Sequence, residues 1–218
     1  MNKLALFDCD GTLVDSQANI CLCMQRTFES AGLAPPPSNA IRRLVGLSLA
    51  ELVTALTPAS DHAVRQSLVT RYRATFFALH EGGLVALEPL FDGISPLLAQ
   101  LIDKGWLLGV ATGKSDRGLA RVLSKHGIAD HFITLQTADR HPSKPHPSMV
   151  HEAMADAGAA PETTIVIGDT SYDMMMAAAA GARGLGVAWG YHPPEELSAA
   201  GAFAVAQVPS DIARLMEA

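Results

Sequence analysis

The chain has 218 residues, and its 22 Asp and Glu residues outnumber its 16 Lys and Arg residues, giving a formal net charge of −6. A chain of this length can bury about 70% of its unfolded surface. With 49% hydrophobic and only 17% charged residues, it is not a disordered protein. The acidic balance, without a cluster of basic residues, argues against nucleic acid and anionic membranes as partners, because binding to either requires that phosphate charge be neutralised.

Cysteine usage and hydropathy predict the cellular compartment. The cysteines at positions 9, 21 and 23 do not form a disulfide framework and favour a reducing environment. The longest uninterrupted apolar stretch, residues 174–182, is about half as long as a membrane-spanning helix. Near the N-terminus, Asp8 interrupts the apolar run too early for a signal peptide. We therefore expect a cytoplasmic protein without a membrane partner; no pattern in the sequence indicates its oligomeric state.

Short apolar runs that end in Gly, Asp or Thr predict the strands of a buried parallel sheet. Helical patterns separate the later runs: one follows the N-cap candidate Ser115 and stops at Gly127, and another starts at Pro147 and stops at Gly158. This alternation predicts an α/β fold, a doubly wound parallel sheet with helices on both faces. The expected strands are residues 4–7, 106–111, 132–135, 164–167 and 184–188.

The segment from Ser16 to about Gly83 breaks the alternation, because it contains only helical spacing. Its longest apolar stripe runs from Val64 to Leu79. We expect an inserted all-helical cap domain over residues 16–86 and an α/β core, the catalytic domain, over residues 1–15 and 87–218. An insert after the first strand would lie over the carboxyl end of the sheet, where open α/β folds bind ligands.

The strongest chemical signal is LFDCDGTLVDS at residues 6–16. Side chains two residues apart on a strand point the same way, so Asp8 and Asp10 should both face the cleft while Cys9 turns away. Two adjacent carboxylates repel each other unless a cation or a shared proton relieves them, and a divalent metal would do so. Gly11 would let the backbone approach an anion. The alternative is a solvated Asp-x-Asp-Gly turn.

A second acidic signal, TIVIGDTSYDMM at residues 164–175, again follows an apolar strand. Its carboxylates are Asp169 and Asp173. Hard oxygen ligands from two strand ends suit Mg²⁺, which is commonly bound by one or two carboxylates together with substrate phosphate. Asp173 lies four residues beyond Asp169, so it could instead cap the following helix without touching a metal.

Two further elements suit an anion beside that metal. The strand that ends at Thr112 and Gly113 offers a hydroxyl group and a backbone N–H at the start of the next helix, where the helix dipole favours negative charge. Lys144 lies between Pro142 and Pro145, so its ammonium group would be presented from a stiffened loop. Alone, such a lysine would simply be solvated.

In this order, the four signals resemble the motifs of the haloacid dehalogenase superfamily of phosphohydrolases, in the phosphoglycolate phosphatase-like branch with a helical cap after the first strand. The resemblance covers nearly the whole chain and implies a Rossmann-like core. It rests on DCDGT at 8–12, Thr112, Lys144 and GDTSYD at 168–173.

The resemblance also implies residue roles. In this family the first Asp is the nucleophile and the Asp two residues later is the general acid and base, which correspond to Asp8 and Asp10. Magnesium would be held by Asp8, the backbone carbonyl of Asp10, and Asp169, with Asp173 supporting the metal site or Lys144. The phosphoryl oxygens would be bound at Thr112, Gly113 and Lys144.

These roles predict a magnesium-dependent phosphatase that hydrolyses small phosphorylated metabolites through an aspartyl-phosphate. Arg42 and Arg43 in the cap are candidates for recognising a second anionic group of the substrate, although helix-surface arginines are commonly only solvated. Two alternatives stay open. One is a β-phosphoglucomutase-like mutase with the same core residues, and the other is a phosphoryl-receiving signalling module, which Asp10 and the helical insert disfavour.

Overall fold

The computed structural model describes residues 1–85 and 88–217, and its core is one parallel β-sheet. The strands lie in the order β3-β2-β1-β4-β5-β6, so the first strand of the chain is central. From β1 the chain first adds strands on one side of the sheet, β2 and β3, and then on the other, β4 to β6. Open α/β sheets bind ligands at such a switch point. The strands are β1 (Asn2–Phe7), β2 (Trp106–Thr112), β3 (Phe132–Thr137), β4 (Ala159–Gly168), β5 (Arg183–Val187) and β6 (Ala202–Ala206).

The five predicted strands are confirmed, and the structure adds one. Strand β4 begins at Ala159, five residues before the predicted start at Thr164. Strand β6 was not expected, because its sequence AFAVA consists mainly of alanine, which has little preference for strands. It pairs with β5 at the edge of the sheet, where tertiary contacts outweigh its weak local preference.

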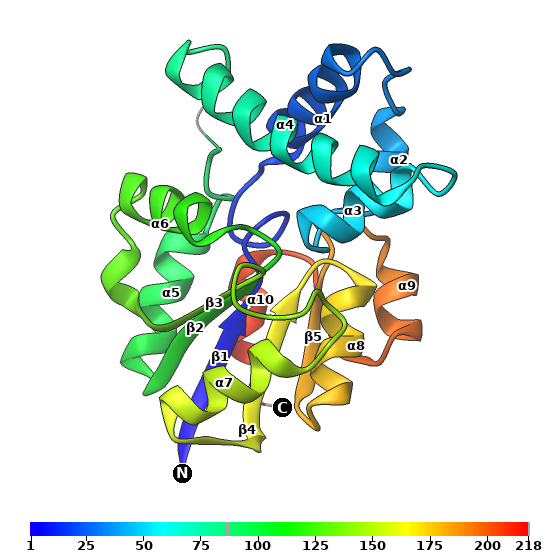
Figure 1. Ribbon diagram of the computed structural model, residues 1–218. Helices are drawn as coiled ribbons and strands as arrows, with labels where there is room; N and C mark the ends of the chain where they lie inside the picture. The colour runs from blue at the N-terminus through cyan, green and yellow to red at the C-terminus, as the bar shows by residue number, and fades with distance from the viewer. Residues whose placement is uncertain (86–87, 218) are drawn as a thin grey trace.

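Helices cover both faces of the sheet, as the predicted doubly wound fold requires (Figure 1). The alternation of side chains along β1 explains the two layers: Ala5 and Phe7 belong to one buried apolar cluster, and Leu4 and Leu6 to the other. The first cluster includes residues of α5, α6 and α10, and the second includes residues of α7 and α8. The helices of the core are α5 (Ile94–Asp103), α6 (Asp116–Lys125), the short η1 (Ala129–His131), α7 (Ser148–Ala157), α8 (Ser171–Ala179), α9 (Pro194–Ala199) and α10 (Pro209–Leu215).

The first four helices of the chain, which follow β1, form a separate layer above the carboxyl ends of the strands (Figure 1). They surround their own apolar cluster, in which Met24, Ile41, Val53 and Leu68 are almost completely buried. The division into residues 16–86 and the remainder stays a prediction, and its limit at 86/87 lies outside the described residues. The helices are α1 (Gln17–Ser30), α2 (Ser38–Arg42), α3 (Leu49–Leu56) and α4 (His62–Glu81).

In the described part of the chain, every helix is too short or too polar to span a lipid bilayer.

We expect Leu98→Ala to lower the free energy of unfolding by about 2–5 kcal/mol, because Leu98 is fully buried between α5 and the sheet and its truncation leaves a cavity. Urea denaturation followed by circular dichroism measures the change. Ile102 lies on the same helix with 42% of its surface exposed, so Ile102→Ala is the control and should cost about 0.5 kcal/mol or less. Equal costs for the two variants would contradict the packing described here.

Candidate active site

The site is built around the end of β1. Phe7 pairs with Val110 of β2 and with Ile167 of β4, and the N–H of Asp8 continues the ladder by donating to the carbonyl of Ile167 at 2.8 Å. Beyond this point, Asp8 and Asp10 are buried, while Cys9 packs into the apolar core. The ends of three adjacent strands therefore meet at Asp8.

The structure brings Asp8 together with Asp169 and Asp173. One carboxylate oxygen of each lies within 4.8 Å of the other two, and all three residues are buried. Asp169 is held from two sides: Oδ1 accepts from the hydroxyl of Thr12 and Oδ2 from the N–H of Tyr191, both at 2.8 Å. In contrast, Oδ2 of Asp8 is buried without a hydrogen-bond partner among the described residues.

Gly11 is required by this arrangement. Its φ of 89° is favourable only for glycine, and a Cβ atom there would lie 2.3 Å from Oδ2 of Asp169 and 2.4 Å from the Tyr191 ring. The anionic group against which Gly11 packs is therefore the carboxylate of Asp169.

Lys144 joins two of the buried carboxylates. Its Nζ donates to Oδ1 of Asp8 and to Oδ1 of Asp173, each at 2.6 Å, and its side chain is fully buried. Burial opposes the charge on Lys144, but the carboxylates of Asp173 and Asp8 outweigh it and raise the pKa of the lysine. Lys144 is therefore a fixed positive charge inside the site.

Burial has the opposite consequence for the carboxylates. It raises the pKa of Asp8 to about 7, against the lowering influence of Lys144 and with a further increase from Asp173 and Asp10. Burial, together with Asp8 and Asp173, also raises the pKa of Asp169. Positive charge in addition to that of Lys144 would therefore favour the ionised form of both carboxylates.

Asp173 has two functions in the structure. Its Oδ2 accepts from the N–H of Thr170, and Thr170 caps α8 in return by accepting from the N–H of Asp173. The other carboxylate oxygen, Oδ1, accepts from Lys144. Asp173 therefore completes the capping box of α8, and this box holds its carboxylate in place beside Lys144.

Thr112 and Gly113 lie at the end of β2, beside the end of β1. Thr112 is fully buried, and its hydroxyl oxygen accepts from the N–H of Lys114 at 3.2 Å. A Cβ atom on Gly113 would lie 2.4 Å from the carbonyl oxygen of Leu47, so only glycine lets the segment between α2 and α3 approach this closely.

Lys114 was not among the predicted site residues. Its Nζ lies 2.8 Å from Oδ1 of Asp10 and 3.3 Å from Oε2 of Glu88, and its side chain is 10% exposed. Burial opposes its charge, but Asp10 and Glu88 outweigh burial and raise its pKa. Its position in the sequence, directly after the predicted site residues Thr112 and Gly113, could have indicated that it belongs to the site. Glu88 belongs to no sequence motif that would have indicated a role in the site, since only the fold brings it to Lys114.

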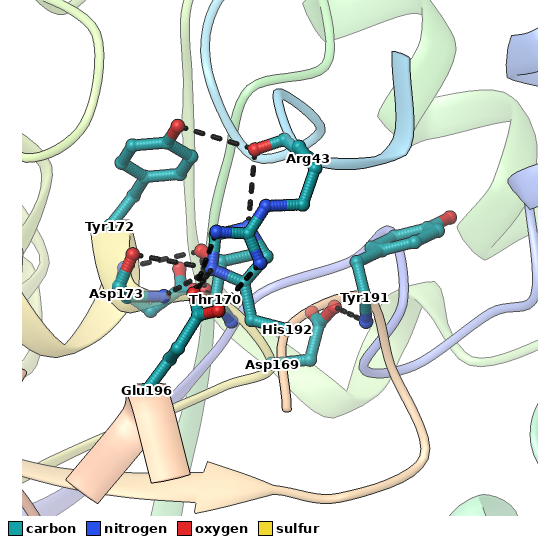
Figure 2. A network of polar contacts seen from close by, with 9 residues as sticks. Arg43, Asp169, Thr170, Tyr172, Asp173, Tyr191, His192 and Glu196 are labelled. Atoms are coloured by element: carbon teal, nitrogen blue, oxygen red, sulfur yellow. Dashed lines mark hydrogen bonds and ion pairs between the residues drawn. The ribbon is translucent and has the colours of Figure 1, made fainter. Parts of the chain in front are cut away.

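A cavity lies beside Asp10, between the helical layer and the core, and neither Arg42 nor Arg43 lines it. Figure 2 shows Arg43 in a network that joins α2 to the core, with both guanidinium Nη atoms donating to Glu196 at 2.8 Å. The backbone carbonyl of Arg43 accepts from the hydroxyl of Tyr172 and from Nε2 of His192. The Arg43 side chain is therefore engaged in a contact between the helical layer and the core.

Comparison with known proteins identifies the family. The sequence profile of the haloacid dehalogenase-like hydrolase family matches residues 5–187. The chain therefore belongs to this family.

Three similar proteins are the probable phosphatase IndB of Dickeya dadantii, the tyrosine-protein kinase PtkA of Mycobacterium tuberculosis and the phosphoglycolate phosphatase of Nitrosococcus oceani. IndB is 36% identical over 92% of this chain and 87% of its own length. PtkA is 33% identical over 87% of this chain, which spans 63% of PtkA. The N. oceani protein is 30% identical over 87% of this chain and 85% of its own length.

Among solved structures, a putative haloacid dehalogenase-like hydrolase from Bacteroides fragilis superposes with a TM-score of 0.89 at 26% identity, covering 97% of this chain and 100% of that one. Together, these similarities identify the chain as a phosphatase of the phosphoglycolate phosphatase-like branch.

We expect His192 to make stability depend on pH. Its Nδ1 accepts from the N–H of Ser171, and burial lowers its pKa, so the folded protein holds it neutral. The unfolded chain takes up a proton near its ordinary pKa of about 6.5. The stabilisation is therefore complete above that pH and is lost as the pH falls toward the lower pKa of the folded state.

Urea denaturation at pH 7.5 and 5.5 tests this expectation. The free energy of unfolding should decrease less between the two pH values in His192→Gln than in the wild type. An equal decrease in both proteins would contradict it.

Proposed function

We propose that the protein is a magnesium-dependent phosphatase that hydrolyses small phosphorylated metabolites through an aspartyl-phosphate on Asp8. The observation that carries the proposal is the environment of Asp8 at the end of β1. One of its carboxylate oxygens is bound by Lys144, and the other is buried without a hydrogen-bond partner among the described residues. A buried carboxylate with a free oxygen suits a nucleophile beside a cation.

The residues around Asp8 fit a divalent cation. One carboxylate oxygen of Asp8 and one of Asp169 are hard donors within 4.8 Å of each other, and Mg²⁺ prefers such donors. We propose that Asp8, Asp169 and the backbone carbonyl of Asp10 hold Mg²⁺, while Asp173 supports the site through Lys144. When bound, the cation would neutralise charge on the carboxylates and on the phosphoryl oxygens.

The nucleophile is Asp8. Burial and the neighbouring carboxylates favour its neutral form. The ammonium group of Lys144, 2.6 Å away, opposes them and favours the anion that is needed for attack. The same ammonium group, with the hydroxyl of Thr112 and the backbone of Gly113, would bind the phosphoryl oxygens. Charge neutralisation is the main requirement, because phosphate monoesters hydrolyse extremely slowly without a catalyst.

The general acid and base is Asp10. An oxygen of Asp8 attacks phosphorus, the bond between phosphorus and the leaving oxygen breaks, and Asp10 protonates that oxygen. Asp10 then removes a proton from the water that attacks the aspartyl-phosphate, which releases inorganic phosphate and restores Asp8. Lys114, 2.8 Å from Asp10, holds the carboxylate in place.

We also propose a cytoplasmic location. The three cysteines are unpaired, as expected in a reducing compartment.

We expect Asp8→Asn to lower the rate with p-nitrophenyl phosphate by at least about a thousandfold, because the amide cannot form the intermediate. Asp10→Asn should lower the rate by about 10²–10⁴-fold and accumulate phosphorylated protein, which intact-mass spectrometry detects. Asp15 is exposed in the same segment, so Asp15→Asn is the control and should keep the wild-type rate. Near-normal turnover by Asp8→Asn would refute the nucleophile. Stoichiometric phosphorylation of the wild type without turnover would favour a phosphoryl receiver.

Removal of divalent metal should abolish activity, and Mg²⁺ should restore it. Mg²⁺ should also raise the melting temperature of the wild type, because a ligand that binds only the folded state stabilises it. Asp169→Asn should lose most of this shift, whereas the exposed control Asp130→Asn should keep it. Full activity in the presence of a chelator, or an equal shift in Asp169→Asn, would contradict the proposed metal site.

A further inference from the structure

A cavity of about 530 Å³ lies between the helical layer and the core. Asp10, Gly113 and Lys114 line its core side, so it opens directly beside the carboxylate proposed to protonate the leaving oxygen. The part of the substrate attached to that oxygen must therefore occupy this cavity. Its volume lies within the range of small-molecule binding sites, and its lining determines which alcohols fit.

The wall that the helical layer contributes to the cavity is mainly apolar and aromatic. It includes Leu52 of α3 and Val69, Tyr72, Phe76 and Phe77 of α4. The rings of Tyr72 and Phe76 are stacked with their centroids 6.3 Å apart. Phe76 and Phe77 are half-buried and belong to none of the buried apolar clusters of the described residues. Rings that line a cavity without contributing to a core are suited to contact a ligand.

Of the described residues, four basic and two acidic side chains line the cavity, and both acidic ones are paired: Asp10 with Lys114 at 2.8 Å and Asp139 with Arg73 at 3.9 Å. The other two basic side chains lie at the aromatic wall. Arg117 of α6 lies over the ring of Phe77, with its guanidinium carbon 3.5 Å from the ring centroid, and Arg121 lies 5.5 Å from the centroid of Phe76. Within residues 1–85 and 88–217, neither arginine has a carboxylate partner. Positive charge therefore borders the aromatic wall, and a cationic leaving group would be repelled there.

We propose that the substrates are phosphate monoesters whose leaving alcohol carries an aromatic or apolar body. This body is neutral or anionic, and the inference rests on the proposed phosphatase function. The body would pack against Phe76 and Phe77 while its oxygen reaches Asp10. A cavity of about 530 Å³ has room for a leaving group much larger than the two carbon atoms of glycolate. The cavity therefore favours larger esters than phosphoglycolate.

The test compares kcat/KM for 2-phenylethyl phosphate and ethyl phosphate. Both leaving groups are primary alcohols, so the comparison measures binding of the phenyl ring rather than the quality of the leaving group. We expect a preference of about 10- to 100-fold for the phenylethyl ester, the factor that corresponds to burial of one aromatic ring. Phosphocholine, whose leaving group is cationic, should be a poor substrate.

A double variant, Phe76→Ala with Phe77→Ala, should reduce the ratio of the two kcat/KM values toward one. Phe203 offers a matched control outside the cavity, because it is an exposed phenylalanine also covered by an arginine, Arg183. Phe203→Ala should leave the ratio unchanged.

An absent preference in the wild type, an unchanged ratio in the double variant or a preference for phosphocholine would each overturn this inference while leaving the proposed phosphatase function intact. If none of the esters were hydrolysed in the presence of Mg²⁺, the proposed function itself would fail.

Discussion

The structure depends on the neutralisation of carboxylates that the fold removes from water. Among the described residues, five buried acidic residues surround the ends of the central strands, and two lysines contact four of them. The acidic residues are Asp8, Asp10, Glu88, Asp169 and Asp173. Burying a carboxylate without a partner is costly, so the ion pairs of Lys144 and Lys114 offset part of the cost of burying these groups. Negative charge still exceeds positive charge, and this imbalance is the physical reason that the site suits a divalent cation.

The two lysines divide the site into two halves. Lys144 contacts Asp8 and Asp173 on the side of the proposed nucleophile, and Lys114 contacts Asp10 and Glu88 on the side of the proposed acid and base. The large cavity opens only onto the second half, since Asp10 and Lys114 line it while Asp8 and Lys144 do not. In the proposed reaction, phosphoryl transfer and recognition of the leaving group would use different surfaces that meet at the end of one strand. Such a separation lets the helical layer vary in specificity while the chemistry stays constant.

The helical layer contributes through two kinds of contact. Polar contacts from Arg43 join it to the core on one side, and exposed ion pairs of this type contribute only about 0–1 kcal/mol each. On the other side, beside the cavity, the aromatic rings of Phe76 and Phe77 on α4 contact Arg121 and Arg117 of α6. Between these sides, the buried ring of Tyr191 joins the apolar cluster of the helical layer, the N–H of Ser48 donates to the hydroxyl of Ser143, and Leu47 packs on Gly113.

Local patterns in the sequence determined the fold class, the five predicted strands, the helical insert and the acidic strand ends. They could do so because the period of apolar residues and the residue that ends a buried strand are properties of neighbouring positions. Strand β6, the pairing of Lys114 with Asp10 and Glu88, and the orientation of Arg43 toward Glu196 depended on the tertiary structure. Each joins residues distant in sequence through packing that no local period encodes, as with Arg43 and Glu196, which lie 153 positions apart.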